Sequence, residues 1–349
     1  MPTTVPALLA DAAGAAFHRG TVERRDLGPR DVAIDIAFAG ICHSDIHQAR
    51  EEWGGAIFPM VPGHEIAGVV SAVGSEVERY AVGDRVGVGC FVDSCRECEY
   101  CLAGEEQFCL KGNVGTYNAR GYDGEPTYGG YSTAVVVDER YVLRIPEGVA
   151  LDVAAPLLCA GITTYSPLKH WGAGPGTKVA VVGLGGLGHM AVQIAHALGA
   201  EVTVISRTRA KEEDARRLGA DHFVATSEPG AYKSVRNTFD LIINTVSADV
   251  DLDALARTLR VGGSLVYVGA PSERQSFAVF SLIGGRRSIA GSNIGGIRET
   301  QEMLDFCGEH GIGAVIETIG ADDVTAAYDR VVAGQVHYRY VIDTATIPA

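Results

Sequence analysis

The sequence predicts a mixed α/β protein in which a β-rich region precedes a doubly wound parallel sheet. At 349 residues the chain is longer than one ordinary domain. Up to about residue 150, short apolar segments are punctuated by glycine, which is typical of short β-strands. From residue 152 the pattern changes to strand, helix, strand, which is typical of a doubly wound sheet.

In the β-rich region, polar and apolar side chains alternate with period two, as they do in half-buried strands. Residues 113–130 are rich in Gly and Tyr and are expected to form a loop. The strands expected in this region are 31–38, 68–74, 84–89, 131–137 and 141–145.

In the second region, the strand expected at 178–182 is an uninterrupted apolar run after Lys178, as suits a strand buried on both faces. A helical pattern at 187–198 follows and stops at Gly199. The sequence does not decide which of the two domains the C-terminal tail completes. The other elements expected are strands at 201–205, 239–244, 264–268 and 338–342 and helices at 210–218, 252–259, 298–309 and 322–333.

Composition narrows the possible partners. A net charge of −14, from 29 basic and 43 acidic residues, argues against nucleic acid or an anionic membrane surface. No apolar run approaches the roughly 18 residues that span a bilayer. Residues 1–20 lack the basic start and apolar stretch of a signal peptide. We therefore expect a cytoplasmic protein, because thiols spaced for metal suit a reducing compartment.

Four of the eight cysteines lie close together, at Cys95, Cys98, Cys101 and Cys109. Four thiolates make a closed tetrahedral zinc site, which is structural. The segment has little apolar content of its own, so metal binding would supply its folding energy. The alternative, a pair of disulfides, does not suit a cytosolic chain.

A second group is dispersed and comprises Cys42, His64 and Cys159. Two thiolates and one imidazole leave one zinc coordination position free, as in a catalytic site. Spacing alone does not connect the three, and single buried cysteines are common. Their neighbours strengthen the interpretation, because Asp45 can accept the second ring proton of His64. Glu65 can approach the metal directly or support its ligands.

Two further polar groups follow Cys42, namely Ser44 and His47. A hydroxyl and an imidazole near a metal thiolate are suitable for moving a proton near neutral pH. The remaining cysteines, Cys90 and Cys307, are expected to pack in the cores.

A glycine-rich run follows the strand at 178–182 and opens a helix, the context that strengthens a dinucleotide fingerprint. Its glycines let the backbone approach a pyrophosphate, whose charge the helix N-terminus favours. The run consists of Gly183, Leu184, Gly185, Gly186, Leu187 and Gly188.

The end of the next strand distinguishes the two nicotinamide cofactors, because an acidic residue there would bind the ribose 2′-hydroxyl of NAD. Here Ser206 is followed by Arg207, with Arg209 and Lys211 nearby. A small hydroxyl and a cation suit a 2′-phosphate, so NADP is predicted. For Arg209, contact with the cofactor and a solvated charge at a helix start stay equally open.

With these motifs assembled, the chain resembles the zinc-dependent medium-chain alcohol dehydrogenases over essentially its whole length. Within them it is most similar to the cinnamyl alcohol dehydrogenase branch and to bacterial broad-specificity NADP-dependent aldehyde reductases. The resemblance rests on Gly-Ile-Cys42-His-Ser-Asp-Ile-His47, Pro-Gly-His64-Glu-Ile, Cys159-Ala-Gly-Ile-Thr-Thr-Tyr, Gly183-Leu-Gly-Gly-Leu-Gly-His and Ala290-Gly-Ser-Asn-Ile-Gly-Gly.

The resemblance implies a GroES-like catalytic domain built from residues 1–151 and 295–349, with a structural-zinc lobe at 90–112. A Rossmann NADP-binding domain at 152–294 would be inserted between them. Two zinc ions per chain are implied, a catalytic one on Cys42, His64 and Cys159 and a structural one on the clustered cysteines.

The resemblance also implies a homodimer joined through the Rossmann domains, and it makes Trp53 a wall of the substrate pocket. Arg207 departs from plant relatives, which often carry a second small residue there. The positions that match cofactor-lining residues are Thr163, Thr245, Val268, Gly269, Ser292, Asn293 and Ile294.

The expected activity is hydride transfer between NADP(H) and a primary alcohol/aldehyde pair, mainly as aldehyde reduction. Ser44 and His47 would pass the proton to the product. An NAD-linked alcohol or polyol dehydrogenase is the alternative enzyme, although Ser206 and Arg207 do not fit it. A non-catalytic nucleotide-binding protein is the alternative outside enzymes, but no zinc ligand or relay residue is lost here.

Overall fold

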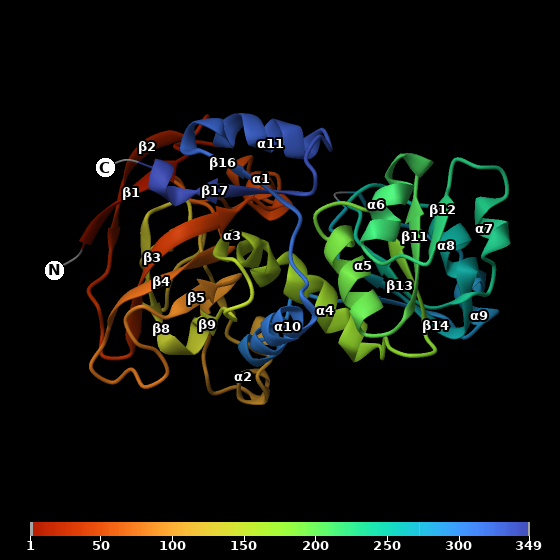
Figure 1. Cartoon of the computed structure of the whole chain (residues 1–349), viewed down its shortest axis with the longest axis horizontal. Coiled ribbons are helices and arrows are strands. Elements are labelled where there is room, and N and C mark those ends of the chain that lie inside the picture. Colours follow the sequence, from red (N-terminus) through yellow and green to blue (C-terminus); the bar gives the residue numbers. More distant parts are fainter. Residues whose placement is uncertain (1–2, 272, 348–349) are drawn as a thin grey trace. The chain divides into compact units, whose positions relative to one another are not determined.

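The computed structural model describes residues 3–271 and 273–347 and divides into two compact units (Figure 1). The first comprises Met1–Ile162 with Gly295–Ala349, and the second comprises Thr163–Ile294. The first boundary falls later than the 151/152 expected from the change of pattern. The reason is that helices α3 (Leu151–Ala154) and η3 (Ala155–Leu158) pack on strands β3 and β4 of the first unit. Cys159 is therefore in the same unit as Cys42 and His64.

The first unit is built on a seven-stranded sheet of order β16-β17-β3-β4-β5-β9, in which β8 also pairs with β3. The long central strand β3 carries the alternating pattern seen in the sequence. The blue tail strands β16 and β17 in Figure 1 join this sheet through antiparallel pairing of β17 with β3, so the tail closes the first unit. The strands are β3 (Asp31–Gly40), β4 (Ile66–Val73), β5 (Arg85–Val88), β8 (Ala134–Asp138), β9 (Leu143–Arg144), β16 (Ile316–Ile319) and β17 (Arg339–Asp343).

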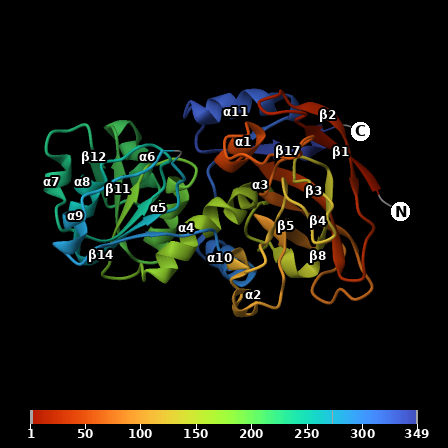
Figure 2. The ribbon, with the colours of Figure 1, turned by 180° about the vertical axis from the view of Figure 1, so that it is seen from behind.

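A hairpin of β1 (Thr3–Leu9) and β2 (His18–Arg24) shares a core with helix α11 (Val324–Val332). Figure 2 shows α11 beside this hairpin from the opposite side. Buried Leu8, Val22 and Tyr328 belong to this core together with Ile46 of helix α1 (His43–Ala49). This core therefore supports helix α1, which directly follows Cys42.

Short elements complete the first unit. The segment expected to be a loop at 113–130 holds only the two-residue strand β7 (Val114–Gly115), which pairs with β6 (Phe91–Asp93). The remaining elements are helix α2 (Glu99–Ala103), 3-10 helices η1 (Glu106–Phe108), η2 (Glu139–Tyr141), η5 (Ala321–Asp323) and η6 (Thr344–Thr346), and helix α10 (Ile297–His310).

The second unit is a six-stranded parallel sheet of order β12-β11-β10-β13-β14-β15, which confirms the doubly wound class. Its strands are β10 (Lys178–Val182), β11 (Glu201–Ser206), β12 (His222–Ala225), β13 (Phe239–Asn244), β14 (Leu259–Tyr267) and β15 (Ser288–Gly291). Its helices are α5 (Gly188–Ala197), η4 (Arg209–Lys211), α6 (Glu212–Arg217), α7 (Ala231–Ser234), α8 (Leu252–Thr258) and α9 (Phe280–Ile283), and α4 (Ala160–His170) begins in the first unit.

Three expected elements differ from the structure. The strand expected at 141–145 is reduced to the two-residue β9, because Tyr141 belongs to the 3-10 helix η2. The strand expected at 131–137 begins only at Ala134, because residues 131 and 132 pair with β1 and with the segment before His64. The helix expected at 210–218 is a 3-10 turn followed by the six-residue α6. Across residues 3–271 and 273–347, no helix is both long and apolar enough to cross a bilayer.

Candidate active site

Cys42, His64 and Cys159 come together in the first unit although they are far apart in the sequence. With Glu65, their ligand atoms lie within 4.8 Å of one another, and all four residues are buried. The Cys42 and Cys159 sulfurs are 3.9 Å apart. Zinc–sulfur bonds of about 2.3 Å in a tetrahedral centre would place two sulfurs ~3.8 Å apart, so the pair fits zinc. A hydrogen bond from the Cys159 thiol lowers the pKa of Cys42, which favours the thiolate that a metal needs.

Asp45 holds two of these ligands at once. It is the third residue of helix α1, where its Oδ2 accepts the backbone N–H of Cys42 at 2.8 Å, as the acid of a capping box does. Its Oδ1 accepts from Nδ1 of His64 at 3.0 Å and from the backbone N–H of Gly63 at 3.2 Å. Because Nδ1 of His64 donates to Asp45, Nε2 keeps a lone pair for a metal.

Glu65 contributes a carboxylate on the same cluster. One oxygen pairs with the buried guanidinium of Arg339 from strand β17. Burial raises the pKa of Glu65 to about 7, against the opposing charge of Arg339. In the described part of the chain, the other oxygen, Oε2, has no hydrogen-bond partner. A buried oxygen without a partner beside two thiols and an imidazole fits a cation site.

Ser44 and His47 lie on helix α1 three residues apart, so they share a helix face. The Ser44 hydroxyl is 3.7 Å from the Cys42 sulfur. The His47 ring stacks on Trp53 at 4.8 Å between centroids, and its Nδ1 is 2.5 Å from Glu52 Oε2. When Glu52 accepts from Nδ1, Nε2 of His47 is left to exchange a proton. Trp53 is half exposed.

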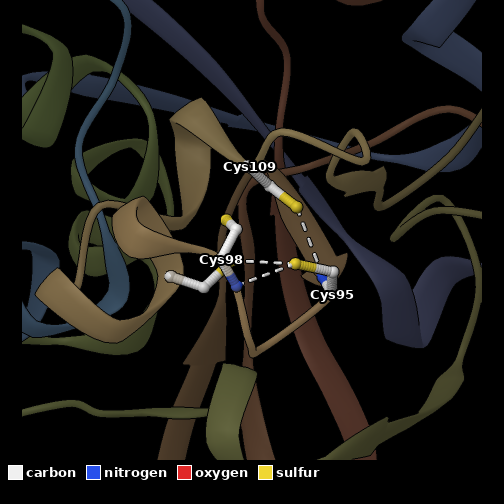
Figure 3. Close-up of side chains that lie close together, drawn as sticks. Cys95, Cys98 and Cys109 are labelled. Carbon is white, nitrogen blue, oxygen red and sulfur yellow. Dashed lines mark hydrogen bonds between the residues drawn. The ribbon is translucent and has the colours of Figure 1, made fainter.

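The clustered cysteines form a second group in the first unit, where the ligand atoms of Cys95, Cys98, Cys101 and Cys109 also lie within 4.8 Å of one another. Figure 3 shows the backbone N–H contacts within it, from Cys95 to the Cys109 sulfur at 3.3 Å and from Cys98 to the Cys95 sulfur at 3.4 Å. The Cys95 and Cys101 sulfurs are 3.8 Å apart, again a tetrahedral zinc spacing.

The surroundings of this lobe act on its thiols unequally, because burial raises the pKa of Cys101 while backbone hydrogen bonds favour the thiolate of Cys98. Hydrogen bonds from the backbone of Cys101 and Leu110 lower the pKa of the Cys98 thiol to about 6. All eight cysteines lie within the described residues and are free thiols, so no disulfide competes for them. Four sulfurs complete the coordination of zinc, which fits a structural ion.

The glycine-rich run in the second unit joins β10 to helix α5. Gly183 has φ +90°, and a Cβ there would meet Val246 at 2.4 Å, so only glycine fits this turn. A Cβ on Gly188 would meet the Gly183 carbonyl oxygen at 2.1 Å. Gly185 differs, because no atom lies within 4 Å of the position of its missing Cβ. This open side of the run fits the close approach of a pyrophosphate.

Most residues expected along the cofactor lie at the carboxyl ends of parallel strands. Ser206 ends β11, and Thr245 follows β13, where its hydroxyl donates to the Val182 carbonyl oxygen at 2.7 Å. The strand order reverses between β10 and β13, the switch point at which doubly wound sheets bind ligands. Val268 and Gly269 follow β14, and Ser292, Asn293 and Ile294 follow β15, whereas Thr163 lies in helix α4.

The basic residues after β11 separate into distinct environments. Arg209 is held by two carboxylates, with Nε 2.6 Å from Glu228 and Nη1 2.6 Å from Glu212. Lys211 instead donates to the carbonyl oxygen of Leu184 in the glycine-rich run at 2.8 Å. Arg207 is exposed, and within the described ranges it forms no ion pair. Arg207 is thus the cation available to a phosphate next to Ser206.

Residues 28–147 match the alcohol dehydrogenase GroES-like domain, and residues 186–309 match the zinc-binding dehydrogenase domain. The chain is 64% identical over 335 residues to the probable formaldehyde dehydrogenase AdhA of Bacillus subtilis, covering 96% of each chain. The chain belongs to the zinc-binding alcohol dehydrogenase family. It is 55% identical to the aldehyde reductase YahK of Escherichia coli, covering 93% of this dehydrogenase and 94% of YahK.

Among solved structures, this dehydrogenase is similar to cinnamyl alcohol dehydrogenase (CAD) from Helicobacter pylori complexed with NADP(H). The TM-score is 0.92 and the identity 45%, with 99% of both chains covered. At this identity the likeness supports the family as well as the fold.

Sequence reasoning missed three residues that the structure brings to the site. Glu52 follows helix α1 and reaches back to His47, and a carboxylate five residues after a candidate shuttle histidine was the available signal. Arg339 pairs with Glu65 from 274 residues away, which no local pattern indicates. Cys90, expected in a core, is only half-buried, and a hydrogen bond with the Cys159 thiol lowers its pKa.

Proposed function

We propose that this dehydrogenase interconverts aldehydes and primary alcohols with zinc and NADP(H), acting mainly as a broad-specificity aldehyde reductase. The observation that carries the proposal is the buried set of two thiols and one imidazole, the ligand set that leaves zinc a position for substrate. The similarity of the chain to the aldehyde reductase YahK supports aldehyde reduction as the main direction, and its similarity to the NADP(H)-bound CAD supports the cofactor.

Cys42, His64 and Cys159 would hold the catalytic zinc, and Cys95, Cys98, Cys101 and Cys109 the structural one. When bound, zinc supplies a Lewis acid for the substrate oxygen, and NADP(H) supplies the hydride. Asp45 keeps the His64 ring oriented and ties the Cys42 backbone to it. Glu65, balanced by Arg339, places a second negative group beside the ligands without leaving an unpaired charge.

The proton would move along helix α1. Ser44, beside the Cys42 sulfur, donates its proton to the product oxygen in aldehyde reduction. His47 restores that proton from solvent, because its ring is partly exposed and imidazole can both accept and donate a proton. Glu52 and Trp53 fix the orientation of the His47 ring through a hydrogen bond and a stacking contact. In alcohol oxidation the same groups work in the reverse order.

We assign NADP(H) binding to the second unit, Thr163–Ile294, and catalysis to the first. Gly183 to Gly188 would receive the pyrophosphate, and Ser206, Arg207 and Lys211 the 2′-phosphate. The NAD-linked alternative gains support from one observation, because Glu212 and Glu228 neutralise Arg209 and reduce the positive charge of the loop. Comparison of NADPH with NADH distinguishes the two.

We also propose a homodimer joined through the second units and a cytoplasmic location. Among the described residues, strand β15 pairs with β14 only, so one of its edges is open to another strand. Several exposed apolar side chains lie in β14 or in the segment that precedes β15 in the sequence. They are Val261, Phe277, Val279, Phe280 and Ile283. Light scattering after gel filtration tests the dimer, with a monomer mass as the contrary result. Free thiols fit a reducing compartment, which cell fractionation tests.

The function is tested by metal content and turnover on one preparation. We expect two zinc ions per chain and aldehyde-dependent oxidation of NADPH that exceeds that of NADH at equal concentration. A panel of aliphatic and aromatic aldehydes ranked by kcat/KM then defines the breadth of the specificity. Zinc binding without aldehyde turnover would favour a non-catalytic nucleotide-binding protein. Faster turnover with NADH and polyols would favour the NAD-linked alternative.

A further inference from the structure

We propose that Tyr131 and Tyr328 are positioning residues of the buried metal site, because their hydroxyls form a hydrogen-bond chain that ends on Asp45. The inference rests on the proposed function in one respect, namely that Cys42, His64 and Cys159 hold zinc. It concerns how tightly that zinc is held. It assigns to the tail helix α11 a part in holding a metal whose ligands all lie in residues 42–159.

Asp45 is fully buried and connects two ligand segments, so its orientation determines theirs. Its Oδ1 accepts hydrogen bonds from Nδ1 of His64 and the backbone N–H of Gly63, and its Oδ2 accepts one from the backbone N–H of Cys42. The Tyr131 hydroxyl donates to the same Oδ2 at 3.4 Å. The phenol therefore sits on the oxygen that faces Cys42, and it restrains rotation of the carboxylate away from the Cys42 backbone.

Tyr131 is itself locked in place. Its side chain is fully buried, and its backbone accepts from Leu8 at 2.8 Å and donates to Pro62 at 2.9 Å. Its ring packs directly against Gly63, where a Cβ would meet ring atom Cδ1 at 2.7 Å. Tyr131 thus touches the backbone that leads into His64 as well as Asp45.

Tyr328 extends the chain into helix α11 by donating to the Tyr131 hydroxyl at 3.3 Å. Phe17 packs edge-on against both rings, with centroids 5.9 Å from Tyr131 and 5.1 Å from Tyr328. Burial raises the pKa of both phenols, so both hydroxyls stay protonated at ordinary pH. Tyr328 therefore donates to Tyr131, and Tyr131 in turn donates to the Asp45 carboxylate.

A carboxylate in a low-dielectric interior depends on each of its donors more than one in water does. If Tyr131 lost its hydroxyl, Asp45 would keep the N–H donors of Cys42, Gly63 and His64 and its interaction with the Tyr117 hydroxyl, but its Oδ2 would have one donor fewer. The contacts of 3.3 Å and 3.4 Å are long for O–H···O bonds, so each contributes modestly. We therefore expect a change in metal retention of a few-fold rather than loss of the fold.

The test measures zinc transfer from the holoenzyme to an excess of a chromogenic chelator. Wild type is expected to release two zinc ions in separate phases, and Cys98→Ser identifies the phase of the lobe by removing it. Tyr131→Phe is expected to speed the other phase about 2- to 10-fold, below the usual span for a hydrogen bond to a charged group because the contact is long, with Tyr328→Phe at the lower end. Asp45→Asn, which touches His64 directly, should speed it roughly 10- to 100-fold.

Matched variants separate positioning from general loss of a buried phenol. Tyr80→Phe removes a buried hydroxyl that donates to the Val142 carbonyl oxygen at 2.5 Å, a bond that involves no residue of either ligand set, and should leave the phase of the dispersed site unchanged. Tyr141→Phe should affect the lobe phase instead, because its hydroxyl contacts Ser94, which is 3.2 Å from the Cys101 sulfur. In an Asp45→Asn background, Tyr131→Phe should add less to the release rate than it does alone.

Two zinc ions with an unchanged release rate in Tyr131→Phe would overturn the inference and leave the proposed function standing. An equal acceleration of both phases would also overturn it, because a general loosening of the fold does not select one site. A wild-type protein that holds only the lobe zinc would overturn the inference and the proposed function together.

Discussion

The lobe at residues 95–109 gathers four thiols from one short segment, whereas Cys42, His64 and Cys159 reach their common site from three distant segments. Three of the four lobe cysteines are partly exposed, while every member of the other cluster is buried. The lobe cysteines receive hydrogen bonds mainly from nearby backbone N–H groups. The dispersed site instead relies on side chains, including Asp45, Arg339 and the phenol of Tyr131.

This difference is the one expected between a structural zinc site and a catalytic zinc site. A ligand set contained in one segment organises that segment when metal binds, and it needs little from the rest of the fold. A set of two thiols and one imidazole that the fold assembles would leave one zinc position for a substrate, as the proposed function requires. An imidazole paired with a carboxylate, His47 with Glu52, accompanies the second set, on and just after the helix that follows Cys42.

The largest expected effect comes from breaking the lobe. Cys98→Ser removes one of four zinc ligands, and structural zinc of this kind contributes about 10–16 kcal/mol of binding free energy that stabilises its fold. We expect loss of one zinc ion, faster proteolysis within residues 90–112 and a lower midpoint of thermal unfolding. A thermal stability equal to wild type would contradict the structural role of the lobe.

The lobe was also the part of the site most accessible to sequence reasoning, because its four ligands are sequence neighbours. The dispersed set was less accessible, since nothing in the spacing of Cys42 and Cys159 connects them and the grouping depended on their flanking residues and on the family resemblance. The Glu65–Arg339 pair depends on β17 pairing with β3, and the sequence left the position of the tail open. Glu52 was overlooked because it lies past the end of helix α1, where periodicity no longer places side chains.

The fold shows the same division. The apolar run before Gly183 predicted β10, because a strand buried on both faces is apolar at nearly every position and is recognisable without knowing its neighbours. Residues 131 to 133 were expected to continue the strand β8, because Tyr131 and Thr133 are residue types that favour strands. Their backbone instead pairs with Pro62 and with Pro6 and Leu8, which is a tertiary choice that the local sequence does not encode.

The next largest effect concerns a hydroxyl in each site. Ser44 lies 3.7 Å from the Cys42 sulfur, and Ser94 lies 3.2 Å from the Cys101 sulfur. Ser44→Ala is expected to lower turnover roughly 10²–10⁴-fold, the usual range for lost proton transfer, while zinc content stays at wild-type level. Ser94→Ala should leave turnover unchanged, as steady-state assays with NADPH and an aldehyde will measure. Near-normal turnover in Ser44→Ala would remove this residue from the proton path.

A smaller effect concerns a carboxylate in each site. Glu52→Gln weakens the acceptor for Nδ1 of His47, and we expect turnover to fall about 3- to 10-fold, as for one weakened hydrogen bond to a charged group at a partly exposed position. Glu97 pairs with Lys111 on the lobe surface, where such pairs contribute little, so Glu97→Gln should leave both turnover and zinc content unchanged. Equal turnover in the two variants would remove Glu52 from the relay.

The most direct test of the division between the two clusters is the metal content, thermal unfolding and turnover of Cys159→Ala, measured on one sample beside wild type. We predict one zinc ion per chain in the variant against two in wild type, a thermal midpoint close to wild type, and no aldehyde-dependent oxidation of NADPH. A variant that keeps two zinc ions and turns over aldehyde, or one that unfolds as Cys98→Ser does, would contradict the assignment of catalysis to the dispersed site.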